Sequence, residues 1–172
     1  MGIKDNKSDF ESLTGNEELW AQVLKSSERS AVLVASAAFD THLERILKGY
    51  FVQNSGVSNL LVKSTLNNFA AKINICFCLG LISSDERHDL NLLREIRNAF
   101  AHNLFGCDFS NPEIISLVSN LTLARKAKAD PTKMEIKHFF NIGMVALDSL
   151  ILVRLKSISP VIECQNIKVS GK

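Results

Sequence analysis

The sequence predicts an all-α fold, a single-domain helical bundle of about five to seven helices. Only 8 of the 172 residues are glycine and 3 are proline, while 46% are hydrophobic, a composition that favours helix over sheet. No stretch shows the alternation of a strand, and helix-capping signals recur. A chain of this length forms one domain with a substantial core. We expect the bundle over residues 16–158, between a flexible N-terminal tail, 1–15, and a C-terminal tail, 159–172.

Four helices are expected in the first half of the chain. Thr14 and Glu17 have capping-box spacing, which predicts a short first helix, and a long amphipathic pattern follows from Glu28. Residues 53–56 form a loop by composition. The fourth segment is apolar on most sides, so we expect it to lie centrally in the packing. The four predicted helices cover residues 17–27, 28–52, 60–67 and 69–81.

Three further helices are expected in the second half, each opened by a polar cap residue that is followed by a proline or an acid. These opening signals are Ser83 with Glu86, Asn111 with Pro112, and Asp130 with Pro131. The first of these helices fades at residues 103–106, the second extends to about Arg125, and the third covers 131–158. Ser159-Pro160 ends the last helix, because proline cannot continue one.

Charge and cysteine content argue against several functional classes. The formal net charge of +2 is low for a DNA-binding domain, and the main basic cluster, residues 125–128 with Lys133 and Lys137, is interpreted as solvated. Cys76 and Cys78 point to nearly opposite sides of a helix, so they cannot chelate one ion. The sequence therefore predicts no metal, no cofactor, no direct sequence-specific DNA binding and no membrane span, in the reducing cytoplasm.

The stretch 92–103, LLREIRNAFAHN, carries the candidate functional residues. At 100° per residue its apolar side chains form one broad arc. The polar side chains on the opposite face are the predicted partner-binding surface, which consists of Arg94, Glu95, Asn98 and His102. A plainer interpretation of His102 is that it helps to satisfy free carbonyls at the helix end. His42, elsewhere in the chain, is interpreted as an ordinary histidine at the surface or rim.

Arg97 is the exception within this helix, because it falls inside the apolar arc. The long helix that starts at Glu28 has a matching exception, since Asp40 projects between apolar positions and Glu44 lies at their rim. We therefore predict a structural buried pair of Arg97 with Asp40 or Glu44. Removing one partner of such a pair would cost about 3–5 kcal/mol, because a buried charge is left uncompensated. The alternative is that Arg97 is a functional residue.

Several blocks of the sequence resemble the mannitol operon repressor family in order and spacing. They are residues 28–34 (ERSAVLV), Asp40, Glu44, 80–83 (GLIS) and 89–102 (DLNLLREIRNAFAH). The resemblance covers nearly the whole predicted domain. It implies an all-helical transcriptional regulator of mannitol use that lacks a DNA-binding domain of its own. Such a repressor would act through protein partners in transcription or sugar-uptake control, and we expect it to be a homodimer.

A second, broader resemblance concerns only the six residues from Arg97 to His102. They are similar to the arginine–polar–histidine pattern of HEPN helical domains, many of which are metal-independent endoribonucleases or their non-catalytic, antitoxin-like relatives. This resemblance implies that Arg97 would stabilise phosphate charge and that His102 would transfer a proton. On one continuous helix the two side chains lie roughly 140° apart. A ribonuclease site would thus need an early helix end or a second chain, and the non-enzymatic regulator is the preferred hypothesis.

Overall fold

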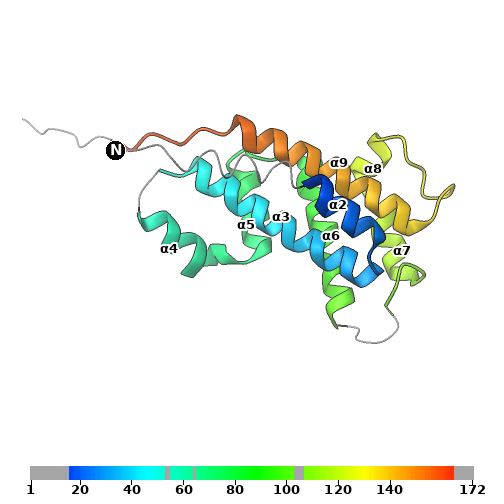
Figure 1. The fold of residues 1–172 in the computed structure, drawn as a ribbon. Helices are drawn as coiled ribbons and strands as arrows, with labels where there is room; N and C mark the ends of the chain where they lie inside the picture. Colours follow the sequence, from blue (N-terminus) through cyan, green and yellow to red (C-terminus); the bar gives the residue numbers. More distant parts are fainter. Residues whose placement is uncertain (1–15, 53–54, 64, 103–106, 165–172) are drawn as a thin grey trace, which may run out of the picture.

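The computed structural model describes residues 16–52, 55–63, 65–102 and 107–164, and all the regular structure in these ranges is helical (Figure 1). The predicted all-α bundle is confirmed. The expected tail 1–15 lies outside the described residues, as does most of 159–172. The described helices are α2 (Asn16–Lys25), α3 (Glu28–Tyr50), α4 (Ser55–Lys63), the 3-10 helix η1 (Thr65–Asn67), α5 (Phe69–Cys78), α6 (Ser84–His102), α7 (Pro112–Ser119), α8 (Thr122–Lys126) and α9 (Ile136–Ser157).

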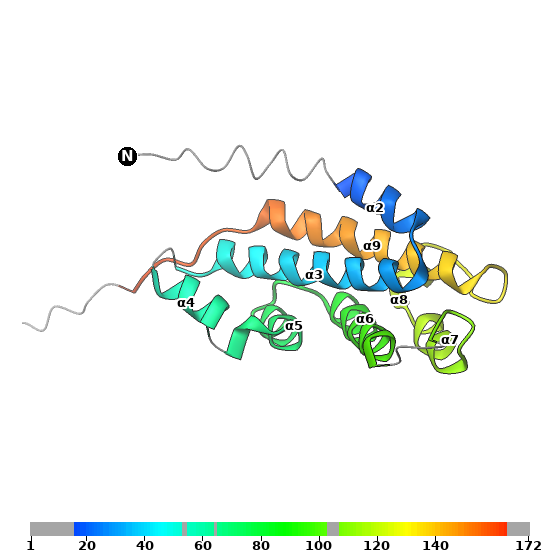
Figure 2. The ribbon, with the colours of Figure 1, turned by 60° about the horizontal axis from the view of Figure 1, so that its bottom comes forward.

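Helix α3 is the centre of the packing. Figure 2 shows α3 with α9 and α2 on one side and the row α4, α5, α6 and α7 on the other. Helix α9 runs alongside α3 and also contacts α6, α7 and α8. Among the described residues, the four fully buried phenylalanines come from α3, α6 and α9, and they are Phe39, Phe100, Phe139 and Phe140. One core thus joins helices from both halves of the chain.

Two of the predicted capping signals are confirmed. The Ser83 hydroxyl accepts the backbone N–H of Glu86 at 3.3 Å, and the Glu86 carboxylate in return accepts the backbone N–H of Ser83, as a capping box requires. The Asn111 side chain accepts the N–H of Glu113 at 2.9 Å, with Pro112 in the first turn. Both helices begin where their local sequence predicts because these contacts satisfy N–H groups that the helix leaves free.

The predicted opening of the last helix is wrong. The Asp130 side chain accepts hydrogen bonds from the backbone N–H and the hydroxyl of Thr132, so it forms a turn and not a helix cap. Helix α9 begins only at Ile136. The signal of an aspartate followed by proline is shared by turns and helix starts, and here the local side-chain bonds favour the turn.

The helix predicted to extend to about Arg125 is divided into α7 and α8. Asp89 of α6 causes the new start, because its buried carboxylate accepts the backbone N–H groups of Thr122 and Leu123, both at 2.8 Å. Burial raises the pKa of Asp89, while these two hydrogen bonds act to lower it. A cap supplied by a distant helix leaves no local sequence signal, which explains the extra helix in the described part of the chain.

The start of α4 also differs from the prediction. Helix α4 begins at Ser55, inside the stretch that composition assigned to a loop.

Helix α9 is, among the described helices, the one long and apolar enough to cross a membrane by length and composition. Its inward side chains, including Phe139, Phe140 and Met144, are fully buried in the bundle, as in the core helix of a globular domain.

Candidate functional site

The predicted partner-binding surface lies on the C-terminal half of α6, next to α7 (Figure 1). Glu95 and His102 are exposed, and Arg94 and Asn98 are partly buried. Glu95, Asn98 and His102 line one open hollow of about 290 Å³, and Ala99 lies between them. Helix α7 completes this hollow, which we call the α6–α7 hollow. The structure thus brings three of the four predicted residues together.

Helix α7 supplies Glu113 and Leu117 to the α6–α7 hollow, two residues that the sequence interpretation missed. The lining contains two apolar residues, Ala99 and Leu117, and two carboxylates that come from different helices, Glu95 and Glu113. Protein-contact sites likewise combine apolar and polar side chains. The fourth predicted residue, Arg94, lies outside the hollow, and its buried Nε has no hydrogen-bond partner among the described residues.

The predicted pair of Arg97 with Asp40 or Glu44 is wrong. Arg97 is exposed, and its Nη1 donates to Oδ1 of the adjacent Asn98 at 3.2 Å. The long arginine stem allows the guanidinium to leave the apolar arc and reach water. Its place in the helical projection therefore did not decide its environment. Arg97 and His102 are both solvent-facing residues of α6.

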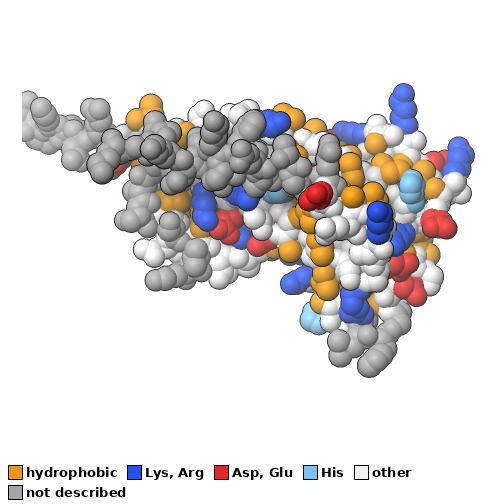
Figure 3. All heavy atoms as spheres, in the orientation of Figure 1, with side chains coloured by type: hydrophobic (Ala, Val, Ile, Leu, Met, Phe, Trp, Pro, Cys, Tyr) orange, Lys and Arg blue, Asp and Glu red, His pale blue; other side chains and the backbone are white. Residues whose placement is uncertain are grey.

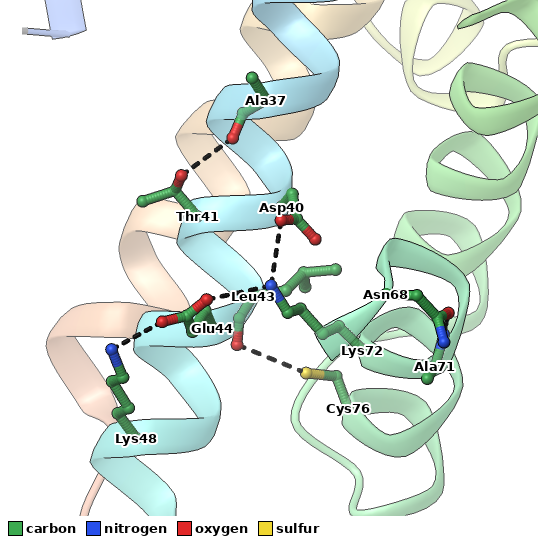
Figure 4. A network of polar contacts seen from close by, with 10 residues as sticks. All are labelled: Ala37, Asp40, Thr41, Leu43, Glu44, Lys48, Asn68, Ala71, Lys72 and Cys76. Carbon is green, nitrogen blue, oxygen red and sulfur yellow. Dashed lines mark hydrogen bonds and ion pairs between the residues drawn. The ribbon is translucent and has the colours of Figure 1, made fainter. Parts of the chain in front are cut away.

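Lys72 of α5 is the cation that the two acids bind (Figure 4). Its Nζ lies 3.0 Å from Asp40 Oδ2 and 3.0 Å from Glu44 Oε2, and its side chain is only 3% exposed. Glu44 also pairs with Lys48 one turn later, at 2.6 Å. Two acids and two lysines thus form a neutral cluster that joins α3 to α5.

The charges in this cluster support one another. Burial alone would lower the pKa of Lys72, but its hydrogen bonds to Asp40 and Glu44 outweigh that effect, and the pKa is raised. The pKa of Glu44 is lowered by its hydrogen bonds to Lys48 and Lys72 in spite of partial burial. Glu44 and Lys72 are therefore both charged near neutral pH, and their contacts join α3 to α5.

One feature of the sequence could have identified Lys72. It is the only charged residue of FAAKINICFC, the segment that forms α5. The spacing of Asp40 and Glu44 places both carboxylates on one face of α3, but it does not say which neighbouring helix that face meets. A lone lysine in an apolar helix was the better candidate, because a buried cation needs a carboxylate more than an exposed one does.

The end of α6 is held by the first two residues of α3. The Arg29 guanidinium donates to the Phe100 carbonyl, near the last turn of α6. The Glu28 carboxylate accepts the backbone N–H of Phe109 at 2.7 Å, on the chain that leads to α7. These contacts fix α6 relative to α7 and therefore fix the shape of the hollow between them.

A second buried polar network joins α2, α3 and α9. Trp20 Nε1 donates to Asp148 Oδ2 at 2.8 Å, and His42 Nε2 lies 3.1 Å from Asp148 Oδ1. All three residues are less than 10% exposed. The interpretation of His42 as a surface or rim residue is therefore wrong. Its signal in the sequence was its position, one residue before Leu43 and three after Phe39, both fully buried.

The described residues contain no group of three or more His, Cys, Asp or Glu side chains that could hold a metal ion. Burial raises the pKa of Cys76 to about 12, although nearby Lys72 acts to lower it. This thiol is therefore protonated and unreactive at neutral pH.

The candidate site is the α6–α7 hollow, a solvent-facing hollow of mixed polarity, which is a kind of surface that binds other molecules.

Fold and site together define the class of an all-helical protein with an open, mixed-polarity hollow between α6 and α7. Comparison with protein families makes this specific. The family model for MtlR, described as mannitol repressor, matches residues 21–151, well over half of the chain. The chain belongs to the mannitol repressor family. Searches of curated proteins and of solved structures gave no match.

Proposed function

We propose that this protein represses the mannitol utilisation operon through protein–protein contacts, without a DNA-binding element of its own. The membership of the mannitol repressor family is the observation that carries the regulatory part of this proposal. We assign the contact surface to the α6–α7 hollow with Arg94 beside it. The partner is a protein of transcription or sugar-uptake control, and the repressor works in the cytoplasm as a homodimer.

The proposed contact surface is supported by setting aside the polar residues that already have internal partners. Many of the polar residues that carry the family resemblance have internal partners: Glu28 and Arg29 hold the end of α6, Asp40 and Glu44 bind Lys72, and Asp89 caps α8. The side chains of Glu95 and His102 form no hydrogen bond or ion pair with any described residue. Side chains without an internal role, gathered around one hollow, are the ones available to a partner.

The absence of direct DNA recognition is supported by the state of the basic residues. Lys126 pairs with Asp85, and Lys133 pairs with Asp130. Lys137 donates to the Ser26 carbonyl at 2.9 Å. On the face drawn in Figure 3, acidic and basic side chains are interspersed. A DNA-binding domain instead gathers its cations on one surface that is free to meet phosphates.

The test is a repression assay in cells that carry a mannitol-operon reporter and lack their own copy of the repressor. We expect Glu95→Lys and Glu113→Lys to relieve repression, because each places a cation at the edge of the hollow. Glu18→Lys makes the same change at an exposed position of α2 and is the matched control. Full repression by both hollow variants, or tight operator binding by the purified protein, would contradict the proposal.

An endoribonuclease of the HEPN type is the second candidate, and the exposure of Arg97 is the observation that favours it. Both Arg97 and His102 reach solvent on α6, where they are accessible to a second chain that completes the site. The purified protein should be incubated with total RNA in a chelating buffer. Cleavage that is lost in His102→Ala would establish this activity, and the absence of cleavage would eliminate it.

A further inference from the structure

A second open hollow, of about 240 Å³, lies where α3 and α9 end. This is the opposite end of the bundle from the α6–α7 hollow. The second hollow is lined by the ends of three helical segments: Tyr50 at the end of α3, Gly80 and Leu81 after α5, and Arg154, Ser157 and Ser159 at the end of α9. Helices α3 and α9 end side by side, as Figure 2 shows. We call this the C-terminal hollow.

The walls of the C-terminal hollow are fixed by contacts. The N–H of Val161 donates to the Tyr50 carbonyl at 2.8 Å, which ties the chain after α9 to the end of α3. Ile158 packs so closely on Gly49 that a Cβ there would lie 2.9 Å from its Cγ2. A site that is formed before its ligand arrives loses little entropy on binding.

Gly80 fixes the third wall. It has φ +70°, and its N–H donates to the Phe77 carbonyl while the N–H of Leu81 donates to the Cys76 carbonyl. This is the Schellman pattern, which ends a helix with a left-handed residue. The turn fixes the backbone of Gly80 and Leu81, which line the hollow together with the ends of α3 and α9.

The charge around the hollow is balanced. Arg154 is the one formally charged residue of the described lining, and its Nε and Nη2 lie 3.2 and 3.3 Å from the carboxylate oxygens of Glu86, a residue with no exposed surface. Three helices end here, and the carbonyl end of a helix carries partial negative charge. An anionic ligand is therefore disfavoured, because the arginine is already neutralised and the helix ends repel negative charge.

The lining offers hydrogen bonds in both directions. Arginine has five N–H donors, so Arg154 keeps donors beyond those on Glu86. The hydroxyls of Tyr50 and Ser159 can donate and accept, while the Ser157 hydroxyl, which donates to the Arg154 carbonyl, can accept. Leu81 and Ile158 add apolar surface that suits C–H groups. We propose that the C-terminal hollow binds a small neutral polyol, a sugar alcohol, as an effector.

This inference rests on the proposed function only for the choice of probe, D-mannitol. Binding is measured on the full chain by saturation-transfer NMR, because polyols stabilise most proteins without occupying a site and a thermal shift alone would mislead. We expect saturable binding with a Kd on the order of 1 mM, the range of small ligands with few contacts.

Two serines of α9 give a matched pair of variants. Both are exposed, and both donate their hydroxyl to a backbone carbonyl about one turn earlier, Ser157 to Arg154 at 3.0 Å and Ser149 to Val145 at 2.9 Å. Ser157→Phe fills the hollow and should weaken D-mannitol binding about tenfold or more. Ser149→Phe, outside the hollow, should leave binding unchanged. Ser159→Phe is a second filling variant in case the first does not fold.

Three results would overturn the inference: no saturable D-mannitol binding, equal binding by both serine variants, or tighter binding of a hexitol phosphate than of the neutral hexitol. The last result would mean that the site selects anions. These outcomes are separable from those of the repression assay. Glu95→Lys should keep D-mannitol binding, and Ser157→Phe should keep the contact surface on α6 and α7.

Discussion

Replacing Lys72 by methionine is the sharpest test of the charge cluster between α3 and α5. Methionine keeps much of the aliphatic stem but removes the ammonium that lies 3.0 Å from both Asp40 and Glu44. Breaking a buried ion pair costs about 3–5 kcal/mol. The two acids keep 36% and 27% of their side-chain exposure, so water screens part of the loss. We expect Lys72→Met to lower the free energy of unfolding by about 2–3 kcal/mol.

The assay is urea unfolding at neutral pH, followed by circular dichroism and by the fluorescence of the single tryptophan. In a thermal scan the same loss corresponds to a decrease in Tm of roughly 5–10 °C for a chain of this size. The slope of the urea transition should not change, since the variant removes a charge and not a folded segment.

The pH dependence gives a second measurement. The pKa of Glu44 is lowered from 4.5 in the folded protein, so its stabilising contribution is present above pH 4.5 and is lost as the pH falls through the lower folded value. The pKa of Lys72 is raised above 10.5, so its contribution is complete below pH 10.5 and is lost as the pH rises through the higher folded value. The difference between wild type and Lys72→Met should therefore be constant across neutral pH and shrink below about pH 4.5.

Arg97→Met is the matched control, because it makes the same kind of change at the arginine that the sequence pattern paired with these acids. Arg97 is exposed and bonds only to Asn98 among the contacts described. An exposed substitution of this kind changes stability by about 0.5 kcal/mol or less. If Arg97→Met destabilised the protein more than Lys72→Met, the cluster described for α3 and α5 would be incorrect.

Three further substitutions test single contacts by urea unfolding. Trp20→Phe removes the N–H that donates to buried Asp148 at 2.8 Å. We expect the free energy of unfolding, measured by circular dichroism, to fall by about 1–2 kcal/mol. An unchanged value would show that this bond contributes nothing to stability. Asp89→Ala leaves two N–H groups of α8 without acceptors and should cost about 2–3 kcal/mol, with faster amide exchange confined to α8. Gly80→Ala meets no atom within 4 Å, so its cost of about 1–2 kcal/mol would come from the positive φ alone; an unchanged stability would contradict the strained turn.

In the second half of the chain, two of the three local cap signals predicted a helix start, and the third, Asp130 with Pro131, marks a turn. Ser83 with Glu86 and Asn111 with Pro112 open α6 and α7 as expected. The start of α8 could not be predicted, because its cap, Asp89, lies on α6 and its contact depends on the packing of distant segments. Local signals carry information only over about one helical turn, and tertiary caps require the fold to be known.

The candidate site was predicted in part for a similar reason. The helical projection placed Glu95, Asn98 and His102 correctly on one solvent-facing side of α6. It could not supply Glu113 and Leu117, because they belong to α7 and meet α6 only in the folded bundle. The projection also failed for Arg97, since a direction from the helix axis describes the Cβ and not the end of a long flexible side chain.

Two acids of α3 carry the family resemblance, but only their side-chain contacts in the structure decide whether they serve binding or packing. Asp40 and Glu44 carry the resemblance, and without coordinates they could belong equally to a binding site. Their contacts with Lys72 assign them to packing, as the contacts of Glu28 and Arg29 assign those residues to holding the end of α6. The residues that carry the resemblance and have no internal partner for their side chains lie around His102. Since α6 is clamped by residues of α3, a variant of Arg29 would change the α6–α7 hollow indirectly, whereas Glu95→Lys changes its surface alone. For that reason charge reversal at the exposed glutamates, and not substitution of the residues with internal partners, separates a contact surface from the scaffold that supports it.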